Sequence, residues 1–118
     1  MKYLLLIHQG TTPLPGSPEW DALSDDERNA VFGAYTAINE TAGVTPGEHM
    51  QSPELATTVR VESGKTLTTD GPFVAVKEAL GGYLFYEADD LDAAIALAAR
   101  VPAASMGGAV EVRPLVSY

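Results

Sequence analysis

The chain has 118 residues, 46% of them hydrophobic, and it contains no Cys. This length and composition predict a single globular domain over residues 1–118, and the lack of thiols excludes disulfides, thiolate zinc sites and thiol catalysis. Seven basic and 16 acidic side chains give a formal net charge of −9, which repels phosphate backbones and anionic lipid headgroups. We therefore expect no direct nucleic-acid binding and no membrane binding.

The N-terminal part of the chain predicts one strand and one helix. Residues 2–8 form a nearly continuous apolar run, which is typical of a central strand covered on both faces. The run is too short for a secretion signal or a membrane span, so we expect a cytoplasmic protein. Residues 9–19 hold three Pro and two Gly and predict a surface loop. Ser24 and Glu27 have the spacing of a capping box, and apolar side chains at helical spacing predict a helix over 25–42.

A β-hairpin is predicted in the middle of the chain. Residues 55–62 alternate and are rich in β-branched side chains, Ser63 and Gly64 supply a two-residue turn, and residues 65–69 return. The segment before the hairpin mixes Pro and Gly with few apolar residues, so it predicts at most a short strand over residues 48–51.

The C-terminal part predicts a second strand–helix–strand unit. Residues 70–82 read as an ordered loop and residues 83–87 as a strand. The Asp pair at 89–90 caps a helix whose apolar side chains repeat at helical spacing until Pro102 ends it. A last strand is predicted over residues 109–114.

The predicted order is strand–helix–strand, hairpin, strand–helix–strand. Two helices on one face of a mostly antiparallel sheet form the ferredoxin-like arrangement, so we expect an α+β domain of that class. The other face of the sheet would stay uncovered although it carries Tyr, Phe, Leu and Val side chains. A second copy of the chain is the simplest cover, and we expect a homodimer with twofold symmetry.

The sequence lacks the common cofactor motifs. Residues 63–66 imitate the end of a phosphate-binding loop, but that motif needs Gly where the chain has Val59 and a helix where a strand is predicted. No dinucleotide, acyl-hydrolase or zinc-protease motif occurs either, so we expect no cofactor and no metal. His8 and His49 fall on different predicted elements, where a structural role is the first interpretation and an acid/base or metal site is the alternative.

The loop that follows the hairpin concentrates chemically useful side chains. Asp70 begins a tight Asp-Gly-Pro-Phe turn that ends at Phe73, and Lys77 and Glu78 follow before a diglycine at 81–82. One interpretation is a turn and nothing more. The other is a small polar pocket, in which the glycines allow close backbone approach. The residue pattern leaves both interpretations open.

Several segments together resemble the DGPF-domain branch of the YCII-related superfamily, and the match covers nearly the whole chain. The segments that carry it are 1–7, 23–28, 69–73, 77–78, 80–83, 90–94 and 107–114. The resemblance implies a dimeric ferredoxin-like fold, in agreement with the pattern of elements. It implies no established reaction: some relatives are linked to acid/base activity through a His–Asp pair, and others to sigma factors, which suggests a regulatory role.

The functional residues of the family carry over only in part. Asp70 matches the signature Asp, and Lys77 and Glu78 match the usual Lys-Glu pair. The family's His near the start of the first helix has no counterpart in residues 25–30. A His–Asp pair in this chain would therefore require His8 or the second His to approach Asp70.

We expect a small organic molecule to bind near Asp70, with Asp70 and His8 as the catalytic acid/base residues. In this hypothesis Lys77 partners the Asp70 charge or binds an anion, and Glu78 fixes the loop or acts as a second acid/base group. The expected binding residues are Lys77, Glu78, Phe73 and Tyr83. One alternative is a non-catalytic regulatory or binding module for a protein partner such as a sigma factor, and another is a purely structural role for the same side chains.

Overall fold

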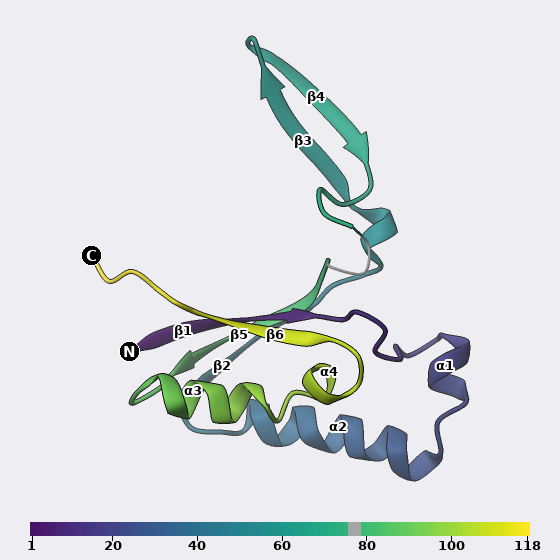
Figure 1. The fold of residues 1–118 in the computed structure, drawn as a ribbon, viewed down its shortest axis with the longest axis vertical. Coiled ribbons are helices and arrows are strands. Elements are labelled where there is room, and N and C mark those ends of the chain that lie inside the picture. The colour runs from purple at the N-terminus through teal and green to yellow at the C-terminus, as the bar shows by residue number, and fades with distance from the viewer. Residues whose placement is uncertain (76–78) are drawn as a thin grey trace.

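The computed structural model describes residues 1–75 and 79–118, and it shows one four-stranded antiparallel sheet with helices on one of its faces (Figure 1). The strand order is β2-β5-β1-β6. The strands are β1 (Lys2–His8), β2 (Val44–His49), β5 (Leu80–Glu87) and β6 (Ala109–Pro114). The long helices are α2 (Asp25–Asn39), which links β1 to β2, and α3 (Leu91–Ala98), which links β5 towards β6. This order and connectivity confirm the ferredoxin-like α+β fold.

The predicted hairpin forms a sheet of its own, made of β3 (Thr57–Glu62) and β4 (Lys65–Asp70). Its strands pair in register from Thr57 opposite Asp70 to Glu62 opposite Lys65. Ser63 and Gly64, both with positive φ, make the two-residue turn. The hairpin rises from the side of the main sheet that the helices leave uncovered (Figure 1).

Two short helices were not predicted from the sequence. The first, α1 (Pro18–Asp21), lies where residues 9–19 predict only loop, and Ser17 caps it by accepting a hydrogen bond from the Trp20 amide. The second is α4 (Pro102–Ser105). Pro102 therefore begins a helix instead of ending one, because its missing N–H costs nothing in the first turn. A single 3₁₀ turn, η1 (Pro53–Leu55), precedes the hairpin.

Several boundaries differ from the sequence-based prediction: β3 begins at Thr57 instead of residue 55, β4 ends at Asp70 instead of residue 69, and α3 ends at Ala98 instead of reaching Pro102. Helix α2 ends at Asn39 instead of residue 42, β2 spans 44–49 instead of 48–51, and β5 begins at Leu80 instead of residue 83. Strands β2 and β5 differ because pairing extends them: β2 hydrogen-bonds to β5, and β5 is central and paired on both edges. The first and last residues of a strand depend on pairing partners that are distant in the sequence, so local propensity does not predict them.

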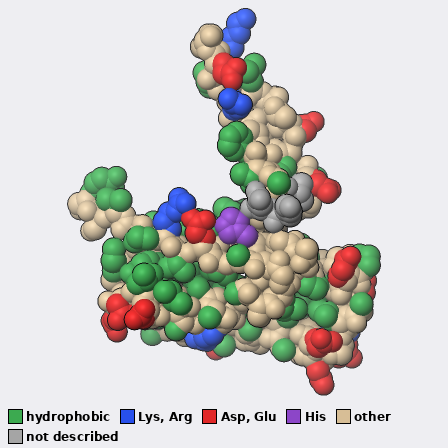
Figure 2. All heavy atoms as spheres, in the orientation of Figure 1, with side chains coloured by type: hydrophobic (Ala, Val, Ile, Leu, Met, Phe, Trp, Pro, Cys, Tyr) green, Lys and Arg blue, Asp and Glu red, His purple; other side chains and the backbone are tan. Residues whose placement is uncertain are grey.

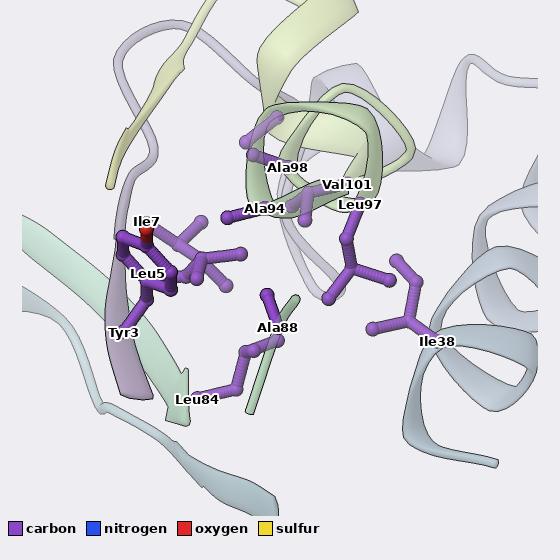
Figure 3. Packing of buried hydrophobic residues seen from close by; sticks show 11 residues of the cluster. Tyr3, Leu5, Ile7, Ile38, Leu84, Ala88, Ala94, Leu97, Ala98 and Val101 are labelled. Carbon is purple, nitrogen blue, oxygen red and sulfur yellow. The ribbon is translucent and has the colours of Figure 1, made fainter. Parts of the chain in front are cut away.

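The core lies between the sheet and the helices (Figure 3). Alternate side chains of β1, namely Tyr3, Leu5 and Ile7, point into it. The intervening Leu4 and Leu6 lie half-buried on the opposite face, which we call the open face. Within one chain, β1 is thus fully covered on one face only.

The start of α2 follows its sequence signal closely. The Ser24 hydroxyl accepts from the Glu27 amide at 3.1 Å, and the Glu27 carboxylate accepts from the Ser24 amide at 2.9 Å. The hydrogen bond from the Ser24 backbone lowers the pKa of Glu27. Both bonds satisfy amides that would otherwise lack a partner at the helix start.

Ser24→Ala is expected to lower the free energy of unfolding by about 1 kcal/mol, because it removes the capping hydroxyl. Urea unfolding at a fixed protein concentration measures the loss. Ser117→Ala, at an exposed position near the C-terminus that caps no helix, is the control. Equal effects of the two substitutions would contradict a stabilising role for the capping box.

Candidate ligand pocket

A pocket of about 290 Å³ lies between α2 and one end of the main sheet. This volume is near the lower end of the range for small-molecule sites, which is about 300–1,000 Å³. Its apolar lining consists of Ile7, Pro13, Leu14, Pro15, Trp20, Val31, Phe32, Tyr35, Leu84, Pro102 and Met106. Its other lining residues are Gln9, Thr12, Asn39, Gly47, Glu48, His49, Gly81, Gly82 and Tyr83.

Aromatic side chains from α1 and α2 form one wall. Trp20 is buried, and its ring meets Phe32 edge to face, with the ring centroids 5.3 Å apart. Tyr35 lies one turn further along α2 and lines the same pocket. Burial raises the pKa of Tyr35, so its hydroxyl stays protonated at neutral pH and can donate a hydrogen bond. The wall therefore suits a flat apolar group.

The opposite wall is the sheet itself. Ile7 and Leu84 are buried core residues that also line the pocket. Gly82 lies opposite Ile7 in the β1–β5 pairing, and Gly81 falls at the point where that register shifts. A side chain at Gly81 would collide with Gln9, another lining residue. Gly81 thus lets the Gln9 side chain pack directly on the strand, whereas a side chain at Gly82 would meet only ordinary contact distances.

Thr12 supplies the most unusual polar group of the pocket. Its Oγ1 is buried and has no hydrogen-bond partner among residues 1–75 and 79–118. The loop that carries it is fixed, since the Thr11 amide donates to the Gly107 carbonyl at 3.0 Å and the Thr12 amide to the Gln9 carbonyl at 2.9 Å. A buried hydroxyl without a partner costs about 1–3 kcal/mol. Because solvent does not reach Oγ1, a ligand in the pocket would bond to it only after the Thr12 side chain turns toward the pocket.

Exposed polar side chains stand at the rim. Asn39 at the end of α2, and Glu48 and His49 in β2, line the pocket and are solvent-exposed. The pocket therefore combines buried apolar walls with polar groups near solvent, which is the usual character of a small-molecule site.

The residues predicted for the site lie in different places. His8 is on the open face, with Nε2 at 3.6 Å from Oε1 of Glu111. Asp70 ends β4 and is exposed, and Phe73 is 78% exposed. Of the predicted set, Tyr83 lines the pocket, whereas His8, Asp70 and Phe73 do not.

Lys77 and Glu78 lie outside the described residues, so their predicted roles stay predictions. The same holds for the acid/base role of Asp70 and His8. Among the described residues, Glu111 is a carboxylate neighbour of His8, and it pairs in turn with Arg113 on the same strand.

Most of the pocket could not be located from the sequence. Trp20 and Thr12 lie in a segment that reads only as a Pro- and Gly-rich loop, and nothing local distinguishes them. Tyr35 belongs to the apolar repeat of α2, which predicts a core position. Of the lining residues, the diglycine, Tyr83 and His49 are singled out by the sequence.

Within residues 1–75 and 79–118, no group of three or more His, Cys, Asp or Glu side chains is arranged to hold a metal ion. Over that same part, no helix has the length and hydrophobicity needed to cross a membrane.

Comparison with known proteins agrees with the fold. A family model, described as YCII-related domain, matches residues 1–118. The chain belongs to the YCII-related domain family. The YCII-related chain is also 31% identical over 102 residues to uncharacterized protein R00369 from Rhizobium meliloti (strain 1021), and the alignment covers 82% of each chain.

Proposed function

We propose that this YCII-related domain binds a small organic molecule with an apolar ring and one hydrogen-bonding group in the pocket between α2 and the sheet. The observation that carries the proposal is the aromatic part of the pocket lining, Trp20, Phe32 and Tyr35, close to a Thr12 hydroxyl that has no partner among the described residues. The ring would lie against Trp20 and Phe32, and the polar group would bond to Thr12 and the Tyr35 hydroxyl.

A thermal-shift screen with phenols and aromatic carboxylic acids tests this proposal. A compound at 100 times its dissociation constant stabilises the folded state by about 2.7 kcal/mol, which a domain of this size reports as a clear shift in Tm. We expect Thr12→Val to weaken binding about fivefold, because it keeps the shape and removes the hydroxyl.

Thr36→Val is the matched control, because Thr36 lies on α2, is exposed and does not line the pocket. Equal affinity in Thr12→Val and Thr36→Val would contradict the proposed contact. Asp70→Ala belongs in the same screen. A compound whose shift is lost in Asp70→Ala and kept in Thr12→Val would move the site to the loop at 70–73 and support the acid/base hypothesis.

A screen without any hit would favour the alternative function, a binding module for another protein. The net charge of −9 fits a basic partner surface, and a sigma factor is the partner that the family resemblance suggests. Pull-down with wild-type protein and with a variant carrying Lys at several acidic surface positions would test that alternative.

The protein is further proposed to work as a homodimer that pairs through the open face of the sheet. Leu4, Leu6, Tyr83 and Phe85 lie half-buried on this face. The Tyr83 and Phe85 rings meet edge to face at 6.0 Å, and Lys2 Nζ lies 5.3 Å from the Phe85 centroid. A half-buried aromatic and aliphatic surface rimmed by charge is typical of an interface between two like subunits.

Sedimentation equilibrium tests the dimer. Phe85→Glu is expected to weaken self-association about tenfold or more, because it buries a carboxylate in the interface. Ile95→Glu, on an exposed position of α3, is the control and should leave association unchanged. A wild-type chain that sediments as a monomer would overturn the dimer.

A further inference from the structure

The β3–β4 hairpin, residues 57–70, forms an arm that stands away from the rest of the chain (Figure 1). None of its side chains is buried. A two-stranded hairpin without further packing is marginally stable at best in water. We therefore expect the arm to be stabilised by packing against another protein surface.

The two faces of the arm differ in character. Val59 and Val61 share one face with the Thr side chains paired opposite them, Thr68 and Thr66. The valines are 58% and 66% exposed. The other face carries the charged side chains Arg60, Glu62 and Lys65, together with Leu67 and Thr69. The arm thus presents a β-branched face, which we call the valine face and which carries Asp70 opposite Thr57 at its base, and a second face, the charged face, that carries the other charged side chains.

The arm stands on the same side of the main sheet as the open face. The arm rises on the side of the sheet opposite the helices, so any body seated on the open face lies beside it (Figure 1). Six extended residues span about 20 Å, whereas two sheets packed face to face are about 10 Å apart. The arm is therefore long enough to pass the whole sheet of a second copy and to reach its flank.

Charge also favours a second copy as the occupant. Residues 60–65 at the end of the arm carry Arg60 and Lys65 against Glu62, a net charge of 2 − 1 = +1. The rest of the chain then carries −9 − 1 = −10. Figure 2 shows basic side chains and an acidic one together at the end of the arm, and more acidic than basic side chains over the body. Arg60 pairs with Glu62 at 3.2 Å within the arm, so the charge excess of the tip is that of Lys65. This single basic group meets the acidic body of another copy without repulsion.

We propose that each arm packs its valine face against the flank of a second copy of this chain, seated on the open face of the sheet. The proposal rests on the dimer proposed above. The arm contact goes beyond that dimer, because the arm of one subunit would form an interface outside the paired sheets. The same contact would hold Asp70 and residues 71–73 at the junction of the two subunits.

Cross-linking between isotopically distinct copies tests the proposal. The chain contains no Cys, so Ser63→Cys gives a single thiol at the end of the arm that can carry a benzophenone. Mixed ¹⁴N and ¹⁵N subunits are irradiated, and the cross-linked peptides are identified by mass spectrometry. We expect mixed-isotope peptides that join the arm to residues of the other copy's body.

Sedimentation of the same samples separates the two proposals. A monomer would overturn both the dimer and the arm contact, whereas a dimer with only same-chain cross-links would overturn the arm contact alone.

The double variant V59K/V61K should weaken the dimer about tenfold, because the packed valine face would have to bury two ammonium groups without partners. L67K/T69K puts the same charges on the charged face and should change it less than threefold. Equal effects would also overturn the proposal, and the cross-linking test remains decisive if either variant fails to fold.

Discussion

Leu5→Ala is expected to lower the free energy of unfolding by about 2–5 kcal/mol. Leu5 lies in the central strand β1, is 0% exposed and packs in the cluster between sheet and helices (Figure 3). Removing its side chain loses buried apolar surface and leaves a cavity that the rigid surroundings refill only in part. Urea unfolding of wild type and variant at one protein concentration measures the difference.

Leu55→Ala provides the comparison, because Leu55 is 69% exposed in the 3₁₀ turn before the arm. This change should stay within about 0.5 kcal/mol, as is usual for surface substitutions. A Leu5→Ala effect as small as that of Leu55→Ala would mean that β1 is not the centre of the core.

Gly10→Ala is expected to destabilise the fold by roughly 2–5 kcal/mol. Gly10 has φ of +57°, a conformation that costs a side-chain-bearing residue about 1–2 kcal/mol. An added Cβ would also collide with the backbone of Gly107, and overpacking of this kind costs about 1–3 kcal/mol more. Because the turn at Gly10 leads to Thr12, the variant should also lose affinity for any compound found in the screen.

Gly16→Ala separates backbone strain from the collision. Gly16 has φ of +90°, but nothing lies within 4 Å of the position its Cβ would take. Its substitution should therefore cost only the strain, about 1–2 kcal/mol, and leave ligand affinity close to wild type. Equal decreases in the free energy of unfolding for Gly10→Ala and Gly16→Ala would contradict the close approach of Gly10 to the Gly107 backbone.

The elements predicted best are those whose signals are local. The apolar run at residues 2–8, the capping box at Ser24, the Ser63-Gly64 turn and the Asp90 cap each place an element within a few residues. Caps and turns satisfy backbone groups with neighbours in the sequence, so the sequence alone reports them. The ferredoxin-like order of elements follows from these signals.

The elements predicted least well depend on distant partners. Strand β2 has Pro46 and Gly47 in its middle and exists because β5 pairs with it, through a register shift between Pro46 and His49. Helix α1 is a four-residue turn whose Trp20 is buried against α2. Short elements of this kind are stabilised mainly by tertiary packing, which no local pattern contains.

The candidate site shows the same division. The diglycine at 81–82 and Tyr83 were recognised because glycines next to an aromatic residue stand out in a sequence, and all of them line the pocket. Asp70 and Phe73 were recognised in the same way, yet they lie on the arm and its following turn, outside the pocket lining. Residue type thus indicated which side chains could bind a ligand or react, whereas the tertiary structure decided where those side chains lie.

By itself the sequence determined the α+β fold, its strong helix starts, the hairpin and the membership of the YCII-related family. Only the tertiary structure decided that Thr12, Trp20 and Tyr35 line one pocket, that His8 faces Glu111 across the open face, and that the hairpin stands apart as an arm. The physical reason is the range of the interactions involved. Capping and turn formation act over three or four residues, whereas strand pairing and burial join residues as far apart as Thr11 and Gly107.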